Sequence, residues 1–460
     1  MNSMSEVITT PRRRRDSGDL LAVGLATTTL MWTVGYLCRI PGTIVPAPFV
    51  LVLLLALLAA GGAWAGARTS RGPWGGLGAG LIAGLFNLLI LGSLGHDLTT
   101  DQRIIDFSIV WVPVSIVLCG ALGLLGGLLG SRFNSDRRQS IDGRAALTRT
   151  TALATLVLVM AGGMVTGLNA GLSVPDWPDT FQYGMFFFPL SHMTGGVFFE
   201  HTHRLLGTLV GLATLVQTIY IWRHEPRRRV KWFAICTLVM VIVQGILGGL
   251  RVTGHFTAAR TRSAMDPSMR LAIVHGILGQ VFFATLVALA AICSPGWRRN
   301  TPAQPTAAFF TDRVLAWTLV AALLVQLTLG GILRHVGGIL TIHITGAVVV
   351  LLLALFCGAR AWGTHPDSSI LSRLGVWLLI VVTLQVLLGV GAVFAIGGQG
   401  PLRHPDFFQA MATTAHQVAG AILLAIAVLL ALWTLRLECP PPVGALGEES
   451  DGTVGMSSNA

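Results

Sequence analysis

The chain has 460 residues, of which 53% are hydrophobic and only 11% are charged. A soluble domain carries about 25% charged residues, so this chain cannot cover a water-facing surface of ordinary polarity. The formal net charge of +11 does not indicate nucleic acid as a partner, because the basic residues gather in short loops between apolar runs, as in membrane proteins. The chain is therefore predicted to be an integral protein of the lipid bilayer.

The N-terminal part begins with residues 1–19, which are polar and predict a disordered basic cytoplasmic tail. A four-helix membrane unit of unknown role is expected over 20–130. Its helices are predicted at 20–37, 46–66, 74–94 and 107–130, because about 20 apolar residues cross a bilayer. The first run follows a basic start, as in a signal peptide, but no clear small-residue cleavage site ends it, so a helix is expected. A basic stretch at 131–147 is interpreted as a cytoplasmic linker.

The C-terminal part predicts an eight-helix core in two groups of four, 148–293 and 312–434, joined by a cytoplasmic loop at 294–311. The core helices are expected at 148–168, 199–222, 231–253, 269–293, 312–333, 338–362, 372–396 and 412–434. A disordered tail is expected at 435–460. The predicted fold class is an all-α polytopic membrane protein with about 12 transmembrane helices.

Loop charges predict the orientation of these helices. Arginines and lysines recur in the loops at 223–231 and 298–313. The alternation of the predicted helices places these loops on the same side as the N-terminal arginines, which indicates the cytoplasmic side. The loop 169–198 has no Lys or Arg and is expected on the opposite side. The protein is therefore expected in the cell membrane, inner or plasma, as a multi-pass protein with both termini cytoplasmic.

A repeat links the two groups of core helices. Glycines mark the outer half of each odd core helix, and a glutamine precedes the first glycine by four residues in three of the four: Gln244, Gln326 and Gln385. Each even core helix holds one histidine near its outer end: His203, His275, His343 and His416. Because the first and third histidines are 140 residues apart and the second and fourth 141, the core is predicted to be two tandem four-helix repeats.

The four histidines indicate a ligand site, because polar side chains inside a membrane are costly and usually functional. The structural alternative is a hydrogen bond between helices. Imidazole is a common axial ligand of haem iron, and no set of cysteines or carboxylates completes a zinc site, so haem is favoured. Glycines that follow the histidines by three or four residues would leave room for a flat macrocycle: Gly207, Gly279, Gly346 and Gly420.

Residues 148–434 resemble the haem A synthase family. The most specific parts are the sequence GLSVPDWP at 171–178 and the sequence EHTHR at 200–204. The resemblance implies an oxidoreductase that converts a methyl group of haem O to the formyl group of haem A for terminal oxidases, and water is the expected oxygen source. It implies that His203 and His275 hold the substrate haem iron. His343 and His416 would hold the iron of a haem b cofactor.

The resemblance also makes Glu200 the catalytic candidate. Glu200 is three residues before His203 and therefore on the same helix face. Its carboxylate could take a proton from water or stabilise positive charge on the reacting methyl group. The alternative is a carboxylate that only favours the start of a helix. Arg204 could pair with a haem propionate or be an interfacial arginine that snorkels.

Two features depart from the family pattern. Some members carry a cysteine pair in the loop corresponding to 169–198, which has none here, and the six cysteines of the chain are isolated. The four N-terminal helices are also additional. The expected partners are haem O synthase, terminal oxidase assembly factors and an electron acceptor that the sequence does not identify.

Two other functions use the same sequence features. A haem b electron carrier linked to quinol would need the four histidines but not Glu200. A non-enzymatic transporter of parallel repeats should carry its polar residues near the midplane of the membrane, whereas these histidines lie toward one face.

Overall fold

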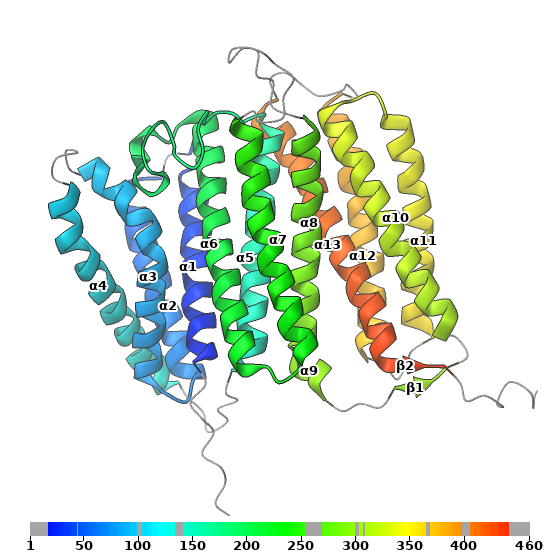
Figure 1. Ribbon diagram of the computed structural model, residues 1–460, viewed down its shortest axis with the longest axis horizontal. Helices are drawn as coiled ribbons and strands as arrows, with labels where there is room; N and C mark the ends of the chain where they lie inside the picture. Colours follow the sequence, from blue (N-terminus) through cyan, green and yellow to red (C-terminus); the bar gives the residue numbers. More distant parts are fainter. Residues whose placement is uncertain are drawn as a thin grey trace, which may run out of the picture. The chain divides into compact units, whose positions relative to one another are not determined.

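The computed structural model describes residues 17–43, 45–98, 104–133, 141–253, 269–299, 303–306, 309–364, 369–397 and 405–440. Within these ranges, 12 helices are long and apolar enough to cross a membrane (Figure 1). The described chain is helical except for an isolated bridge in one loop and two strands of two residues each, β1 (Gln304–Pro305) and β2 (Glu438–Cys439), which pair in parallel. The predicted all-helical multi-pass fold is thus confirmed, whereas most of both expected tails lies outside the described residues.

The chain divides into two compact units, of which the first comprises Met1–Arg39, Ile44–Leu88 and Asp106–Thr150. The helices that supply it are α1 (Gly18–Cys38), α2 (Ala47–Arg68), α3 (Pro73–Leu98) and α4 (Ile104–Arg132). Glycines let these backbones approach closely, as is common between helices in lipid. A Cβ atom on Gly66 of α2 would lie 2.7 Å from the Cα atom of Gly127 on α4.

The second unit comprises Ile40–Thr43, Leu89–Ile105 and Thr151–Ala460. The long helices that supply it are α5 (Gly143–Gly167), α6 (Gly195–His224), α7 (Arg228–Thr253), α8 (Met269–Ile292), α10 (Phe309–His335), α11 (Leu340–Gly363), α12 (Ser369–Ala395) and α13 (Phe407–Leu437). Three short helices connect them: η2 (Met185–Phe187), η3 (Leu190–His192) and α9 (Pro295–Arg298). The end of this unit where α5 and α7 finish and α6 and α8 begin is called the histidine end below.

Several helices extend beyond the apolar runs that predicted them. Helix α6 begins at Gly195, after the N-cap residue Thr194, so Glu200 lies in its second turn and does not open it as expected. Helix α5 already begins at Gly143, and α13 continues to Leu437. Hydropathy detects only the part of a helix that resembles hydrocarbon, so polar or glycine-rich helix ends fall outside its windows.

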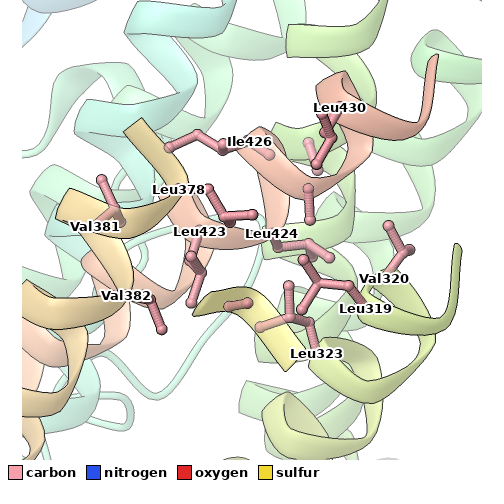
Figure 2. Close-up of a cluster of buried hydrophobic side chains, with 14 of the residues drawn as sticks. Leu319, Val320, Leu323, Leu378, Val381, Val382, Leu423, Leu424, Ile426 and Leu430 are labelled. Carbon is pink, nitrogen blue, oxygen red and sulfur yellow. The ribbon is translucent and has the colours of Figure 1, made fainter. Parts of the chain in front are cut away.

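A buried apolar cluster holds α10 to α13 together (Figure 2). Leu319 of α10, Leu378 of α12 and Leu423 of α13 are at most 1% exposed. Phe283 of α8 and Val159 of α5 belong to the same cluster, so the two groups of four helices share a core. Because lipid is as apolar as leucine, these contacts stabilise the unit through close packing rather than through exclusion of water.

Candidate functional site

The four predicted histidines form two pairs at the histidine end. His203 of α6 faces His275 of α8, with ring centroids 6.4 Å apart and ring planes at 86°. His343 of α11 faces His416 of α13, again at 6.4 Å, with planes at 82°. All four are half-buried. The two pairs therefore have nearly the same geometry, although they lie on different helices.

Each histidine ring packs against a glycine of the preceding helix in the chain. A Cβ atom at that glycine would lie close to the Cε1 atom of the ring: 2.9 Å for Gly162 and His203, 3.4 Å for Gly248 and His275, 3.2 Å for Gly330 and His343, and 2.9 Å for Gly389 and His416. Distances below about 3 Å would force the ring or the helix to move. The glycines that marked the odd helices in the sequence therefore make room for the imidazoles themselves.

Hydrogen bonds orient the second pair. The Nδ1 atom of His416 lies 3.1 Å from the backbone oxygen of Gln385. The Nε2 atom of Gln326 lies 3.1 Å from Nδ1 of His343 and donates to the His343 carbonyl at 2.8 Å. A histidine that donates from one ring nitrogen to a carbonyl is left with the other nitrogen as a ligand atom, an arrangement that suits His416.

The first pair also has contacts with the preceding helices. Gln244 donates from Nε2 to the backbone oxygen of His275 at 3.2 Å. The rings of His203 and His275 are hydrogen-bonded to backbone groups of Leu158 and Gln244, respectively. These backbone contacts correspond to the one between His416 and Gln385 in the second pair.

The predicted macrocycle glycines differ between the pairs. A Cβ atom on Gly207 would meet nothing within 4 Å, and one on Gly279 would meet only Gln244, at 3.7 Å. In the second pair, Gly346 directly contacts the side chain of Gln326, and a Cβ atom on Gly420 would lie 3.2 Å from Gln385. The space beside the first pair is therefore open, whereas glutamine amides stand beside the second pair.

Glu200 and Arg204 anchor the long loop 168–194, coloured green between α5 and α6 in Figure 1. Arg204 donates from Nη1 to the carbonyls of Asp176 and Asp179 at 2.8 and 3.0 Å, and from Nη2 to the carbonyl of Val174 at 3.1 Å. Its Nη2 also bonds Oε1 of Glu200 at 2.8 Å. The other Glu200 oxygen accepts from the Val174 N–H at 2.9 Å. The guanidinium expected to bind a propionate is thus already bonded to the loop and to Glu200.

Further contacts fold the same loop over α6. His201 is fully buried, and its Nδ1 atom lies 3.1 Å from Oγ1 of Thr180. Its ring packs on Phe188 with centroids 5.0 Å apart, so His201 faces the loop rather than the first pair, as its position two residues before His203 predicted. The Asp176 carboxylate accepts from the backbone N–H groups of 181 and 182 at 2.9 and 2.8 Å.

Two residues near the first pair were given no role from the sequence, although Trp177 belongs to the motif at 171–178. The Trp177 indole packs against Gly249 of α7, where a Cβ atom would lie 2.6 Å from its Cε2 atom. Arg251 of α7 lies against the loop at Gly171, where a Cβ atom would be 2.6 Å from Nη2. An arginine near a helix end is usually interpreted as interfacial. The sequence feature that could have identified Arg251 is its position three residues after Gly248, which places both on the same helix face.

The paired histidines fit the axial ligands of haem. Two imidazoles bonded to opposite sides of one iron have ring centroids roughly 6 Å apart, since a metal–imidazole bond is about 2 Å long. Both pairs, at 6.4 Å, match that separation. Among the described residues, no group of three or more His, Cys, Asp or Glu side chains could hold a metal ion. The donor sets therefore suit an iron whose equatorial ligands come from a macrocycle.

Known proteins match the chain around this site. Residues 145–343 match the family of cytochrome oxidase assembly proteins named COX15-CtaA. The haem A synthase of Geobacillus kaustophilus is 30% identical over 112 residues, which are 22% of this chain and 32% of that protein. The haem A synthase of Beijerinckia indica is 28% identical over 212 residues, covering 39% of this chain and 55% of that protein.

A longer alignment is found with the haem A synthase of a Chelativorans species, which is 24% identical over 304 residues and covers 52% of this chain and 79% of that protein. The chain thus aligns with only about a third to four fifths of the length of these relatives. The family match includes His203, His275 and His343. Residues 145–343 are therefore similar to the COX15-CtaA family, and the chain has distant haem A synthase homologues.

Proposed function

We propose that this protein is a haem A synthase, which oxidises a methyl group of haem O to the formyl group of haem A. The observation that carries the proposal is the presence of two histidine pairs of equal geometry, of which three histidines lie within the COX15-CtaA family match. We also propose the tandem four-helix repeat. The similar geometry of the two pairs and the four glycine–histidine contacts support it.

The two pairs are proposed to have different tasks. His203 and His275 bind the substrate haem, because the space beside Gly207 and Gly279 is open and the anchored loop covers the adjoining end of α6. His343 and His416 bind a haem b cofactor, which supplies electron transfer when bound. The amides of Gln326 and Gln385 beside this pair suit a cofactor that stays in place rather than a substrate that enters and leaves.

The proposed reaction adds one oxygen atom to the methyl carbon and removes hydrogen from it. Conversion of the methyl group and one water molecule to a formyl group releases four protons and four electrons, and the electrons pass to an acceptor that remains to be identified. Glu200 is the proposed catalytic carboxylate. Lying one turn before His203, it can stabilise the positive charge that develops as the methyl group is oxidised. Arg204 and the Val174 N–H hold both of its oxygens in place.

The cellular setting follows from the same family. The proposed location is the cell membrane, with both termini on the cytoplasmic side and the histidine end on the opposite side. Haem O synthase and terminal oxidase assembly factors are the proposed partners, since the family is described as one of cytochrome oxidase assembly. The helices at 20–130 have no proposed function.

The test is co-expression of the full chain with a haem O synthase, followed by haem extraction and mass analysis. Haem A should appear with the intact protein and not with the His203→Ala variant. Two bound haem b groups that do not respond to haem O would instead establish the electron carrier. A purified protein without haem absorption would favour the transporter.

A further inference from the structure

Arg251 is a cation beside the first histidine pair whose hydrogen bonding is incomplete. Its Nε atom is buried and has no hydrogen-bond partner among the described residues. Its charge acts on the rings of both His203 and His275. The loop lies against the guanidinium at Gly171, with only 2.6 and 2.9 Å from a Cβ position to Nη2 and Nη1. The guanidinium therefore packs against the loop, close enough to the first pair for its charge to act on both rings.

No carboxylate among the described residues forms an ion pair with Arg251. Glu200 acts on it electrostatically, but both Glu200 oxygens are already bonded, one to Arg204 at 2.8 Å and one to the Val174 N–H at 2.9 Å. A guanidinium cannot lose its proton to relieve burial, and a buried charge is costly unless it is paired and hydrogen-bonded. An additional anion would therefore stabilise the half-buried Arg251.

We propose that Arg251 binds a propionate carboxylate of the haem held by His203 and His275. This inference rests on the proposed function, since it assumes a haem in the first pair. The planar guanidinium matches a carboxylate with two parallel hydrogen bonds. Haem carries its carboxylates at one edge of the macrocycle, and binding them on one side fixes the rotation of the ring about the iron. Arg251 would therefore decide which methyl group faces Glu200.

Among the described residues, no arginine is found to act on the rings of the second pair. Arg334 lies four residues after Gly330 on α10, near the position that Arg251 holds after Gly248 on α7. Its Nη2 atom, however, donates to the backbone oxygen of Thr166 and to Oδ1 of Asn169. The guanidinium of Arg334 is thus used to join α10 to the end of α5. The proposed carboxylate contact therefore belongs to the first pair.

The experiment compares haem with its dimethyl ester, in which both carboxylates are blocked. Full-length protein would be purified without haem from haem-deficient cells and titrated with each compound. The affinity of the first pair is defined as the binding that His203→Ala removes. In the wild type, the ester should bind roughly ten- to hundredfold more weakly than haem, as expected for loss of a charge-assisted hydrogen bond.

Substitutions then identify the partner of the carboxylate. Arg251→Gln should weaken haem binding by about the same factor as esterification does in the wild type. This variant should bind haem and its ester equally. Arg251→Lys, which keeps the charge but loses the planar fork, should retain part of the discrimination. Gly171→Ala should also reduce it, because the new methyl group pushes the guanidinium aside. The control is Arg270→Gln at the exposed start of α8, which should behave as the wild type.

The results separate this inference from the proposed function. If His203→Ala and His275→Ala both keep the wild-type haem content, the proposed function itself fails. If those variants lose haem but Arg251→Gln still distinguishes haem from its ester, only the role of Arg251 fails. Equal binding of haem and its ester by the wild type would also overturn the inference. This outcome does not depend on whether any variant folds.

Discussion

The positions of the four imidazole rings depend on the missing side chains of the neighbouring glycines. At Gly162 and Gly389 a methyl group would lie 2.9 Å from the ring, whereas at Gly248 it would lie at 3.4 Å. The first distance requires a ring or a helix to shift, and the second is an ordinary contact. The same substitution should therefore have different effects at positions that look alike in the sequence.

Gly389→Ala is expected to disturb iron ligation by His416 and to destabilise the protein by about 1–3 kcal/mol, the range for overpacking. Gly248→Ala should leave ligation by His275 nearly unchanged. Absorption and electron paramagnetic resonance spectra of the bound haem would measure both effects. Equal spectra for the two variants would mean that the glycines do not control the position of the rings.

Gly207 permits a test of the space beside the first pair. Because a Cβ atom at Gly207 meets nothing within 4 Å, Gly207→Leu should fold normally but fill the space and block haem at His203 and His275. Gly207→Ala should be milder. Haem content and thermal stability would be measured together. Normal haem content in the leucine variant would show that the open space is not used by the macrocycle.

At the scale of elements, the first pair is enclosed by a loop that helix α6 itself holds. The backbone atoms of Val174, Asp176 and Asp179 bond to the side chains of Glu200 and Arg204, which lie within one turn of His203. Side chains bound to backbone atoms restrict the loop regardless of its own sequence. Glu200 can therefore serve the loop, the chemistry, or both, and a single substitution does not distinguish these roles.

Glu200→Gln and Arg204→Gln together make the distinction. Both variants weaken the loop anchor, but only the first removes the carboxylate. If Glu200 acts on the reacting methyl group or its proton, Glu200→Gln should lower the rate of haem A formation by roughly 10²–10⁴-fold more than Arg204→Gln. Hydrogen exchange over residues 171–182 would show whether the loop is loosened equally. Equal losses of rate, with equal exchange, would leave Glu200 a loop anchor only.

At the scale of the whole molecule, the two pairs are built on separate helices but share one core. Phe283 of α8 and Val159 of α5 enter the apolar cluster of α10 to α13, and Arg334 joins α10 to Thr166 and Asn169 at the end of α5. The pairs can thus be held at a fixed separation while each ligates its own haem.

His343→Ala is accordingly expected to remove the haem of the second pair and leave that of the first. The apparent melting temperature should fall, because a ligand bound only by the folded state stabilises it. His203→Ala should remove the other haem. Haem stoichiometry and absorption spectra of both variants, each at equal protein concentration, provide the measurement. Loss of both groups from either variant would show that the two sites do not bind independently.

The sequence by itself determined the membrane class, about 12 spans and the four histidines, because hydropathy and spacing are properties of the chain alone. It also placed His201 away from the ligand pair, since residues two apart on a helix face different directions. Its predicted boundary missed the glycine-rich start of α6, and therefore put Glu200 at a helix end rather than in the second turn.

Only the tertiary structure decided which atoms meet. The bonding of Arg204 to the loop 168–194, the packing of each ring against a glycine, and the position of Arg251 beneath Gly171 all join segments distant in the chain. Sequence periodicity reports the face on which a residue lies, but not its partner on another helix. An arginine near a helix end has the same pattern whether it faces lipid headgroups, a carbonyl or a buried site, and its burial and hydrogen bonds separate these cases.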